Sequence, residues 1–503
     1  MEKVIHKSVK LIVIVLGVLT FLWTVYSFNY LIDIVAYLKF NFSTVMILTI
    51  GVGCYILSKI FKINNFAFLY HYKYRIMVIL LLVQILFIFL TSAQAGADTT
   101  GVFESVQGIS SPEYFSAFTN NYLYGLYVKG IISVFGVSYA ILVQEIINIL
   151  LLDIVILIVP AALSRYISEQ AAYKSFLFLL LTLGINPTII STYTDYLSIF
   201  TASLIFCFCL KFVNTKLKLY ESLLFGMIFS IGVQIRVTSF IFIIGLAVVE
   251  ILNLFMNKSN IRKLSYYKLL SIVIIIIGFA IPTMLANFAK ANQVVHYTSG
   301  QTKPLLYFLD LGLTSTGSNH FELPAEVLQY GPSTEKINKI VKNDLKKRLS
   351  HYDIKMALYK FQKGYEAGDF GWQAERVVDE KKLVRNNMTR EFIDSKFGKF
   401  IRKNIFPIDQ TYLTYELLLQ ITYIVVIMES LLALINIAFT DLERDKTAMY
   451  ILITLLGMFL YFGLFEFGRS RYLLSFWPMI VSVSTIPYLK MKNRGSRLEL
   501  KVG

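Results

Sequence analysis

Charged side chains are scarce in this chain. Of its 503 residues, 16% are Asp, Glu, Lys or Arg, whereas 56% are hydrophobic. Soluble globular domains carry about 25% charged residues, so this composition excludes a set of ordinary soluble domains. Glycine and proline, with 27 and 10 residues, are too few for a fibrous or disordered chain. The composition therefore predicts an integral membrane protein.

Cysteine is rare, and histidines at metal-ligand spacing are lacking. The three cysteines, Cys54, Cys207 and Cys209, lie inside apolar runs without a further Cys or His nearby, which argues against a disulfide framework and a zinc site. The five histidines show no paired spacing: His6, His71, His296, His320 and His351. We therefore expect no metal or other cofactor. His320, close to Glu322, is kept only as a candidate substrate-binding residue.

Nucleotide-binding motifs are also lacking. The sequence contains no P-loop, no dinucleotide-binding glycine fingerprint and no long internal repeat. A P-loop would be needed to cradle the phosphates of ATP. ATP-driven transport within this chain is therefore disfavoured.

Long apolar runs dominate what is present. A helix of about 20 apolar residues crosses the hydrocarbon core, because each residue rises about 1.5 Å and the core is about 30 Å thick. Twelve runs approach this length: residues 11–35, 43–61, 76–95, 138–164, 173–190, 192–213, 220–236, 237–256, 268–289, 414–438, 446–465 and 471–488. The runs that meet at Gln234–Arg236 form either two helices or one broken unit. We expect an all-α polytopic membrane protein with about 12 transmembrane helices.

Lysine and arginine are distributed unevenly between the two sides of this arrangement. The termini and loops assigned to the cytoplasm hold 23 Lys and Arg residues, and the short segments on the other side hold five. Cationic short loops stay in the cytoplasm. The pattern predicts a multi-pass protein of the cell membrane with both termini cytoplasmic, and it accounts for much of the net charge of +16.

Two longer polar segments interrupt the runs, and the same assignment places both outside the cytoplasm. The first long loop covers residues 96–137, and the second long loop covers residues 291–412, with 19 Lys and Arg against 14 Asp and Glu. We expect amphipathic helices in both loops. The chain thus divides into an N-terminal transmembrane module that includes the first long loop (1–290), the second long loop, and C-terminal transmembrane helices with a cytoplasmic tail (413–503).

Polar residues gather where the predicted helices reach the outer side. The first long loop opens with Gly96-Ala97-Asp98-Thr99-Thr100, directly after the third run. Other polar groups at this level are Glu104, Asn120, Asn121, Asp195, Arg236, Glu466, Arg469, Arg471 and Tyr472. A carboxylate suits proton transfer, and arginine suits phosphate, because its planar fork matches phosphate oxygens.

This layout resembles the C-type glycosyltransferase superfamily, whose polytopic members transfer a sugar from a polyprenyl-phosphate lipid to an acceptor outside the cytoplasm. The matching features are Asp98 in the first outer loop and Arg471-Tyr472 with Pro478 in a late span. A closer resemblance, to Gram-positive-like bacterial members, rests on Tyr114, Phe115, Asn120, Asn121, Tyr193-Thr194-Asp195, Leu311-Gly312-Leu313 and Gly368-Asp369-Phe370-Gly371-Trp372. The sequence departs from that pattern at Thr99, Thr119 and Arg236-Val237-Thr238.

The resemblance implies an inverting glycosyltransferase that uses a polyprenyl-phosphate sugar donor. Asp98 would be the catalytic base, and Arg469, Arg471 and Arg236 would bind the donor phosphate. The substrate-binding candidates are Glu104, Asn120, Asn121, Asp195, Tyr472, His320 and Asp369. The acceptor would be a cell-envelope glycan, a teichoic-acid-like polymer or a glycolipid, and no nucleic acid is expected as a partner.

Several alternatives stay open on the sequence alone. Glu104 competes with Asp98 as the base, Asp195 pairs with an arginine instead of contacting a ligand, and Asn120 and Asn121 cap a helix. Ionisable residues inside the apolar runs, Glu145, Asp153 and Glu429, form a proton path if the protein is a secondary transporter or a flippase of lipid-linked glycans. A glycan polymerase or ligase shares the same architecture.

Overall fold

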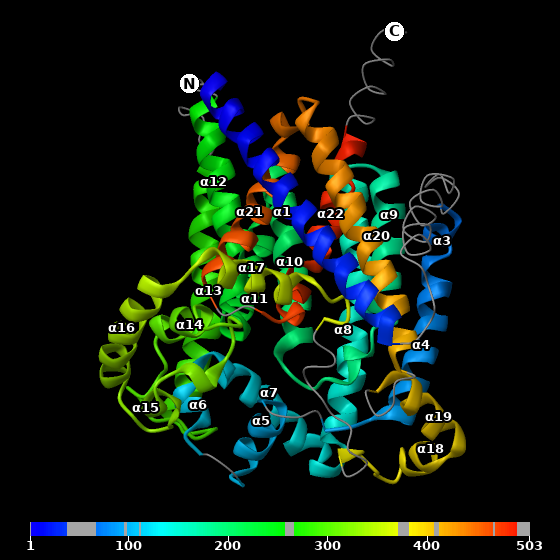
Figure 1. Cartoon of the computed structure of the whole chain (residues 1–503), viewed down its shortest axis with the longest axis vertical. Helices are drawn as coiled ribbons and strands as arrows, with labels where there is room; N and C mark the ends of the chain where they lie inside the picture. Colours follow the sequence, from blue (N-terminus) through cyan, green and yellow to red (C-terminus); the bar gives the residue numbers. More distant parts are fainter. Residues whose placement is uncertain are drawn as a thin grey trace.

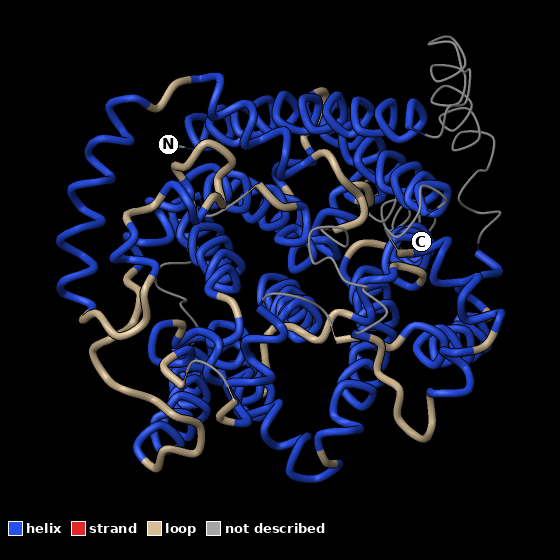
Figure 2. Tube along the Cα trace, turned by 60° about the horizontal axis from the view of Figure 1, so that its bottom comes forward, coloured by secondary structure: helices blue, strands red, loops and turns tan. Residues whose placement is uncertain are grey.

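The computed structural model describes residues 2–37, 67–94, 98–109, 112–256, 266–370, 382–406, 412–465 and 468–489. Within these ranges the chain consists of helices joined by turns and loops, and Figure 2 draws no strand among them. The short helices are α3 (Ala67–His71), α5 (Asp98–Gln107), α6 (Tyr114–Ala117), η2 (Thr119–Asn121), α7 (Tyr122–Phe135), α14 (Leu305–Gly312), η7 (His320–Glu322), α15 (Ala325–Leu328), α16 (Thr334–His351), α17 (Ile354–Tyr365), α18 (Arg390–Asp394), α19 (Lys396–Ile405) and η10 (Leu442–Arg444).

Eight of the described helices are long and apolar enough to cross a membrane. They are α1 (Glu2–Tyr37), α4 (Lys73–Thr91), α8 (Val137–Tyr166), α10 (Thr194–Asn214), α12 (Phe240–Met256) counted together with the turn η5 (Val237–Ser239) before it, α13 (Tyr266–Ala291), α20 (Leu413–Ala438) and α21 (Lys446–Leu464). Each corresponds to one of the predicted apolar runs. The prediction of an all-α polytopic membrane protein is therefore confirmed.

The expected number of about twelve regular spans is not found in the described part of the chain. The run at 43–61 lies outside the described residues. The run at 220–236 is α11 (Leu219–Ile235), which has only 17 residues. The other two runs are broken into short pieces: 173–190 becomes α9 (Glu169–Leu179), η3 (Leu180–Gly184) and η4 (Pro187–Ile190), and 471–488 becomes η11 (Ser470–Phe476), α22 (Trp477–Val483) and η12 (Ile486–Tyr488).

Proline and burial explain why these two runs break. Pro187 cannot donate a backbone hydrogen bond inside a helix, and the Asn186 side chain instead accepts from the Thr188 N–H at 2.9 Å. Pro478 lies in the first turn of α22, where its missing N–H costs little. Irregular backbone is tolerated at membrane depth only where protein surrounds it, and most side chains of η4, η11 and α22 are buried.

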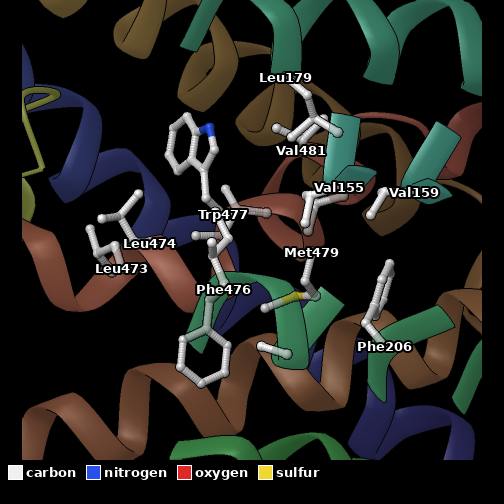
Figure 3. Close-up of a cluster of buried hydrophobic side chains, with 14 of the residues drawn as sticks. Val155, Val159, Leu179, Phe206, Leu473, Leu474, Phe476, Trp477, Met479 and Val481 are labelled. Atoms are coloured by element: carbon white, nitrogen blue, oxygen red, sulfur yellow. The ribbon is translucent and has the colours of Figure 1, made fainter. Parts of the chain in front are cut away.

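The last of these broken runs passes through the centre of the core. Figure 3 shows Phe476, Trp477 and Met479 among side chains of other helices, including Val155 of α8, Leu179 of α9 and Phe206 of α10. Trp477 donates from Nε1 to Thr182 Oγ1 at 2.7 Å and stacks on Tyr423 with ring centroids 5.0 Å apart. This packing fixes the segment that begins with Arg471.

Helices of the two long loops gather at one end of the molecule. In Figure 1, α5, α6, α7, α15, α16, α18 and α19 lie in the lower half, whereas α1 begins at the top. The loops are joined by hydrogen bonds from Thr298 N to Ser116 Oγ at 2.8 Å and from Lys303 N to Ala117 O at 2.9 Å. The two loops therefore form one helical cap over the same ends of the long helices.

Two glycines allow α11 and α13 to approach closely. A Cβ atom at Gly226 would lie 2.1 Å from the carbonyl oxygen of Ile275, and one at Gly278 would lie 2.3 Å from that of Leu223. Small residues at such positions let helix backbones come together in a membrane. Any larger residue at either position would push the two helices apart.

We expect Gly226→Val to lower the melting temperature of the purified protein in detergent. Overpacking of this kind costs about 1–3 kcal/mol or more when the neighbour is backbone and cannot give way. The matched control is Gly17→Ala in α1, because a Cβ at Gly17 meets nothing within 4 Å. Thermal unfolding measures the melting temperature of each protein. Equal values for Gly226→Val and the parent protein would contradict this helix contact.

Candidate functional site

A cavity of about 390 Å³ lies where the two long loops meet the ends of the long helices. Several segments of the chain supply its polar lining: Asp98, Tyr114, Asn120, Asn121, Tyr193, Thr194, Arg236, Thr238, Thr302, Lys303, Tyr307, His320, Tyr461, Arg471 and Tyr472. Seven sequence-predicted site residues are in this set, namely Asp98, Asn120, Asn121, Arg236, His320, Arg471 and Tyr472. Residues of both long loops therefore line one cavity.

Breaks in the helices place the charged residues at this cavity. Asp98 is the first residue of α5. Arg236 separates α11 from η5 (Val237–Ser239) in an extended conformation, with φ −148° and ψ 122°, so the two runs that meet there are two helices. Gly468, with φ +118° and the Thr316 carbonyl 2.1 Å from where a Cβ would be, makes the turn before Arg471. That turn requires glycine.

Asp98 and Arg471 lie next to each other on the cavity wall. Arg471 Nη2 lies 3.5 Å from Asp98 Oδ2, and the Asp98 side chain is 47% exposed while that of Arg471 is 4% exposed. The Arg471 guanidinium also lies 5.5 Å from the ring centroids of Tyr193 and Tyr472. The carboxylate is thus open to the cavity, whereas the cation beside it is fixed by aromatic rings.

Arg236 supplies a second cation on the same wall, and its side chain is 12% exposed. It forms an ion pair with Asp195, whose side chain is 4% exposed, and its guanidinium lies 5.6 Å from the ring centroid of Tyr472. Its Nη1 atom is buried and has no hydrogen-bond partner among the described residues. Asp195 does not line the cavity, so its contact favours the interpretation that it positions Arg236.

The Asn121 side chain is part of a hydrogen-bond network with two tyrosines. It donates from Nδ2 to Tyr114 Oη at 2.8 Å and to Tyr193 Oη at 3.0 Å, and it makes no side-chain cap of α7. Burial and, less strongly, the nearby Asp98 carboxylate raise the pKa of the Tyr114 phenol, which stays a hydrogen-bond donor at neutral pH. The helix-cap alternative for Asn121 is therefore wrong, and the network ties the first long loop to α10.

The segment before Asp98 is anchored by a buried glutamate. Glu145 of α8 accepts from Ser92 Oγ at 2.6 Å and from the Ala93 N–H at 3.3 Å. Ala93 also forms an isolated antiparallel bridge with Leu383 of the second long loop. Since Asp98 follows only a few residues later, these contacts position the start of the loop that carries it.

Each of the other two ionisable candidates in the spans also has a partner of its own. Asp153 accepts from Gln84 Nε2 at 3.2 Å, and Glu429 pairs with Lys174 Nζ at 2.6 Å. Both contacts tie neighbouring helices together. Among the described residues, no group of three or more His, Cys, Asp or Glu side chains is placed to hold a metal ion.

Besides Asp195, three predicted site residues do not line the cavity: Glu104, Arg469 and Asp369. Asp369 is buried and accepts from Ser470 Oγ at 3.2 Å, directly beside Arg471 in sequence. The adjacent Gly368 donates its N–H to Gln420 Oε1 of α20 at 2.7 Å. This segment therefore joins the second long loop to the helix core near the cavity wall.

Lys303 is a cavity residue that sequence reasoning missed. It stands two residues before α14, lies beside the rings of Tyr307 and Phe118, and is 4% exposed. On the same wall, Tyr307 Oη lies 3.3 Å from His320 Nδ1. The only local signal is a lysine directly before Pro304, which is too common to single out.

The arrangement combines one half-exposed carboxylate with two buried cations, Lys303 and Arg471, and the partly buried Arg236 around a single cavity. Such a carboxylate can take a proton from a hydroxyl group. Guanidinium and ammonium groups in a partly dry site can hold phosphate and stabilise charge that develops on it. The site is thus suited to a phosphate-bearing substrate and a hydroxyl nucleophile.

Comparison with protein families identifies the family to which the chain is similar. The model of a family described as "Conserved hypothetical integral membrane protein" matches residues 1–491, a span that includes every residue of the cavity. Neither the comparison with curated proteins nor that with solved structures finds a match.

Proposed function

Since the chain belongs to the conserved hypothetical integral membrane protein family, we propose an activity on a membrane-borne substrate. The activity is transfer of a sugar from a polyprenyl-phosphate carrier to the hydroxyl group of a cell-envelope glycan, teichoic-acid-like polymer or glycolipid. The protein is then a C-type glycosyltransferase that works on the outer face of the cell membrane.

The observation that carries this proposal is the meeting of Asp98, Arg236 and Arg471 at one cavity. The three residues come from three helix breaks far apart in the chain. A sugar phosphate ester has an anionic leaving group, so its transfer needs a base for the acceptor and cations for the departing phosphate, but no acid for the leaving group. The cavity supplies these groups.

The apolar part of the cavity supports a lipid-linked donor. Ile235, Val237, Leu305, Phe462 and Phe465 line it next to the arginines, and Val237 and Leu305 are 44% and 61% exposed, so this side is open. Ile235 ends α11, and Val237 opens the segment that leads into α12. An isoprenoid chain in the membrane can therefore reach the cavity while its phosphate lies beside Arg236 and Arg471.

The reaction follows from these positions. The acceptor oxygen attacks the anomeric carbon while Asp98 takes the proton from the acceptor hydroxyl. The bond between that carbon and the phosphate oxygen breaks, and the phosphate leaves with the electron pair toward Arg236 and Arg471. A single displacement inverts the anomeric configuration.

The proposal is tested by incubating the purified protein in liposomes with a radiolabelled polyprenyl-phosphate sugar and a panel of acceptors. We expect labelled sugar to appear on at least one acceptor, with an anomeric configuration opposite to that of the donor. A protein that moves lipid-linked sugar across the bilayer without transferring it would instead be a flippase. The control is protein denatured by heat before reconstitution.

A further inference from the structure

Lys303 is a buried cation whose side chain faces the cavity. It is 4% exposed, and it lines the wall that the second long loop contributes. Its Nζ atom lies 4.5 Å from the ring centroid of Tyr307 and 5.4 Å from that of Phe118. The ammonium group is therefore held away from bulk water at a fixed place on the cavity wall.

Lys303 lacks the carboxylate that each cavity arginine has. Arg236 pairs with Asp195, and Arg471 lies 3.5 Å from Asp98, whereas Lys303 forms no ion pair within the described ranges. A buried charge is costly unless it is paired. Cation–π contact with two rings offsets only part of that cost.

The ammonium group also keeps hydrogen-bond capacity. Its Nζ donates to the Val327 carbonyl of α15, which uses one of its three N–H groups. Its backbone N–H donates to the Ala117 carbonyl at 2.9 Å. Lys303 is therefore held by the first long loop through Ala117 and by the second long loop through Val327. The remaining donors are available to a group that enters the cavity.

We propose that Lys303 binds an anionic group of the substrate, a phosphate or a carboxylate, on the cavity wall that the second long loop contributes. The anionic group of the ligand would supply the negative charge that pairs with the Lys303 ammonium group. This assignment rests on the proposed transferase function only for the source of the anion, which is either the donor's lipid phosphate or an acidic acceptor.

The subsite has a pH dependence that identifies it. Burial lowers the pKa of Lys303 to about 8. Below that pH the ammonium group is already protonated, so its own titration no longer changes anion binding. Above it, binding requires uptake of a proton and weakens up to tenfold per pH unit. The titratable side chains on the elements packed against Lys303 are Tyr307 of α14, His320 of η7 and Glu326 of α15, and Tyr114 and Tyr330 lie beside Phe118.

Binding to the full-length protein in detergent tests the assignment with three probes. They are a short-chain polyprenyl phosphate, a glycerol phosphate oligomer as an acidic acceptor, and an uncharged oligosaccharide. We expect Lys303→Met to weaken at least one anionic probe about ten- to hundredfold and to leave the uncharged probe unchanged. The probe that weakens identifies the anion as that of the donor or that of the acceptor.

Lys303→Arg is the matched control, because arginine stays charged throughout this range. We expect it to keep the affinity of the parent protein at pH 7 and to abolish the loss above pH 8. If Lys303→Met fails to fold, judged by its melting temperature, the pH profiles of the parent and of Lys303→Arg decide the question.

Unchanged affinity of both anionic probes, or no binding of either by the parent protein, would overturn the assignment. So would the same pH profile for the parent and for Lys303→Arg. Since no probe carries a transferable sugar on phosphate, the result does not depend on turnover. A protein that binds through Lys303 but transfers no sugar would disprove the transferase proposal alone.

Discussion

Asp98→Asn is expected to lower the rate of sugar transfer about a hundredfold or more, while donor binding stays near that of the parent protein. Asparagine keeps the size of the side chain and an oxygen that can accept from Arg471 Nη2, which lies 3.5 Å from Asp98 Oδ2. It removes the basicity together with the negative charge of the carboxylate. Steady-state transfer from a synthetic polyprenyl-phosphate sugar and equilibrium binding of the same donor separate the two effects.

Glu104→Gln is the matched control for this prediction. Glu104 lies on the same helix α5 and carries the same charge, but it does not line the cavity. We expect its transfer rate to remain within about twofold of the parent protein, because a base must reach the proton it removes. If Glu104→Gln transferred sugar slowly while Asp98→Asn kept the rate of the parent protein, Glu104 and not Asp98 would be the base.

Arg471→Ala is expected to weaken transition-state stabilisation by about 2–4 kcal/mol, or roughly thirty- to a thousandfold in kcat/KM. The Arg471 side chain is 4% exposed and is held between Tyr193 and Tyr472. Its charge therefore acts in a partly dry site, where water cannot replace it. Donor binding should weaken as well, in contrast to Asp98→Asn.

Arg469→Ala separates a site-specific effect from a general loss of positive charge. Arg469 stands two residues earlier, in the same turn, and does not line the cavity. We expect a smaller effect on kcat/KM than for Arg471→Ala. Equal effects would restore the sequence-based hypothesis that both arginines bind the donor phosphate, and full activity of Arg471→Ala would remove Arg471 from the site. Melting temperatures of both variants show whether a loss of activity reflects misfolding.

The sequence predicted the long helices well because their signal is local. A run such as Val137–Tyr166 is apolar over its whole length, and a membrane requires such a segment to satisfy its own backbone hydrogen bonds. The run at 471–488 looked the same by composition but is not a regular helix. Its surroundings, including Tyr423 and Thr182, allow a 3-10 segment there, and no local pattern reports those partners.

Asp98, Arg236 and Arg471 were recognised in the sequence because polar residues at the ends of apolar runs are conspicuous. Lys303 was missed, and Arg469 and Asp369 were placed with the cavity residues, because each assignment depends on which way a side chain points. Arg469 and Arg471 are only two residues apart. The turn at Gly468 and the packing of η11 decide that Arg471, and not Arg469, lines the cavity.

The sequence by itself determined that this chain is a helical membrane protein, where most of its long helices begin and end, and which polar residues lie at one end of them. These properties follow from hydrophobicity summed along short stretches. Only the tertiary structure decided that Asp98, Arg471 and Lys303 share a cavity and that Asp195 lies behind Arg236 as its partner. Such contacts join residues up to several hundred positions apart, and they depend on packing between helices, which no stretch of sequence contains.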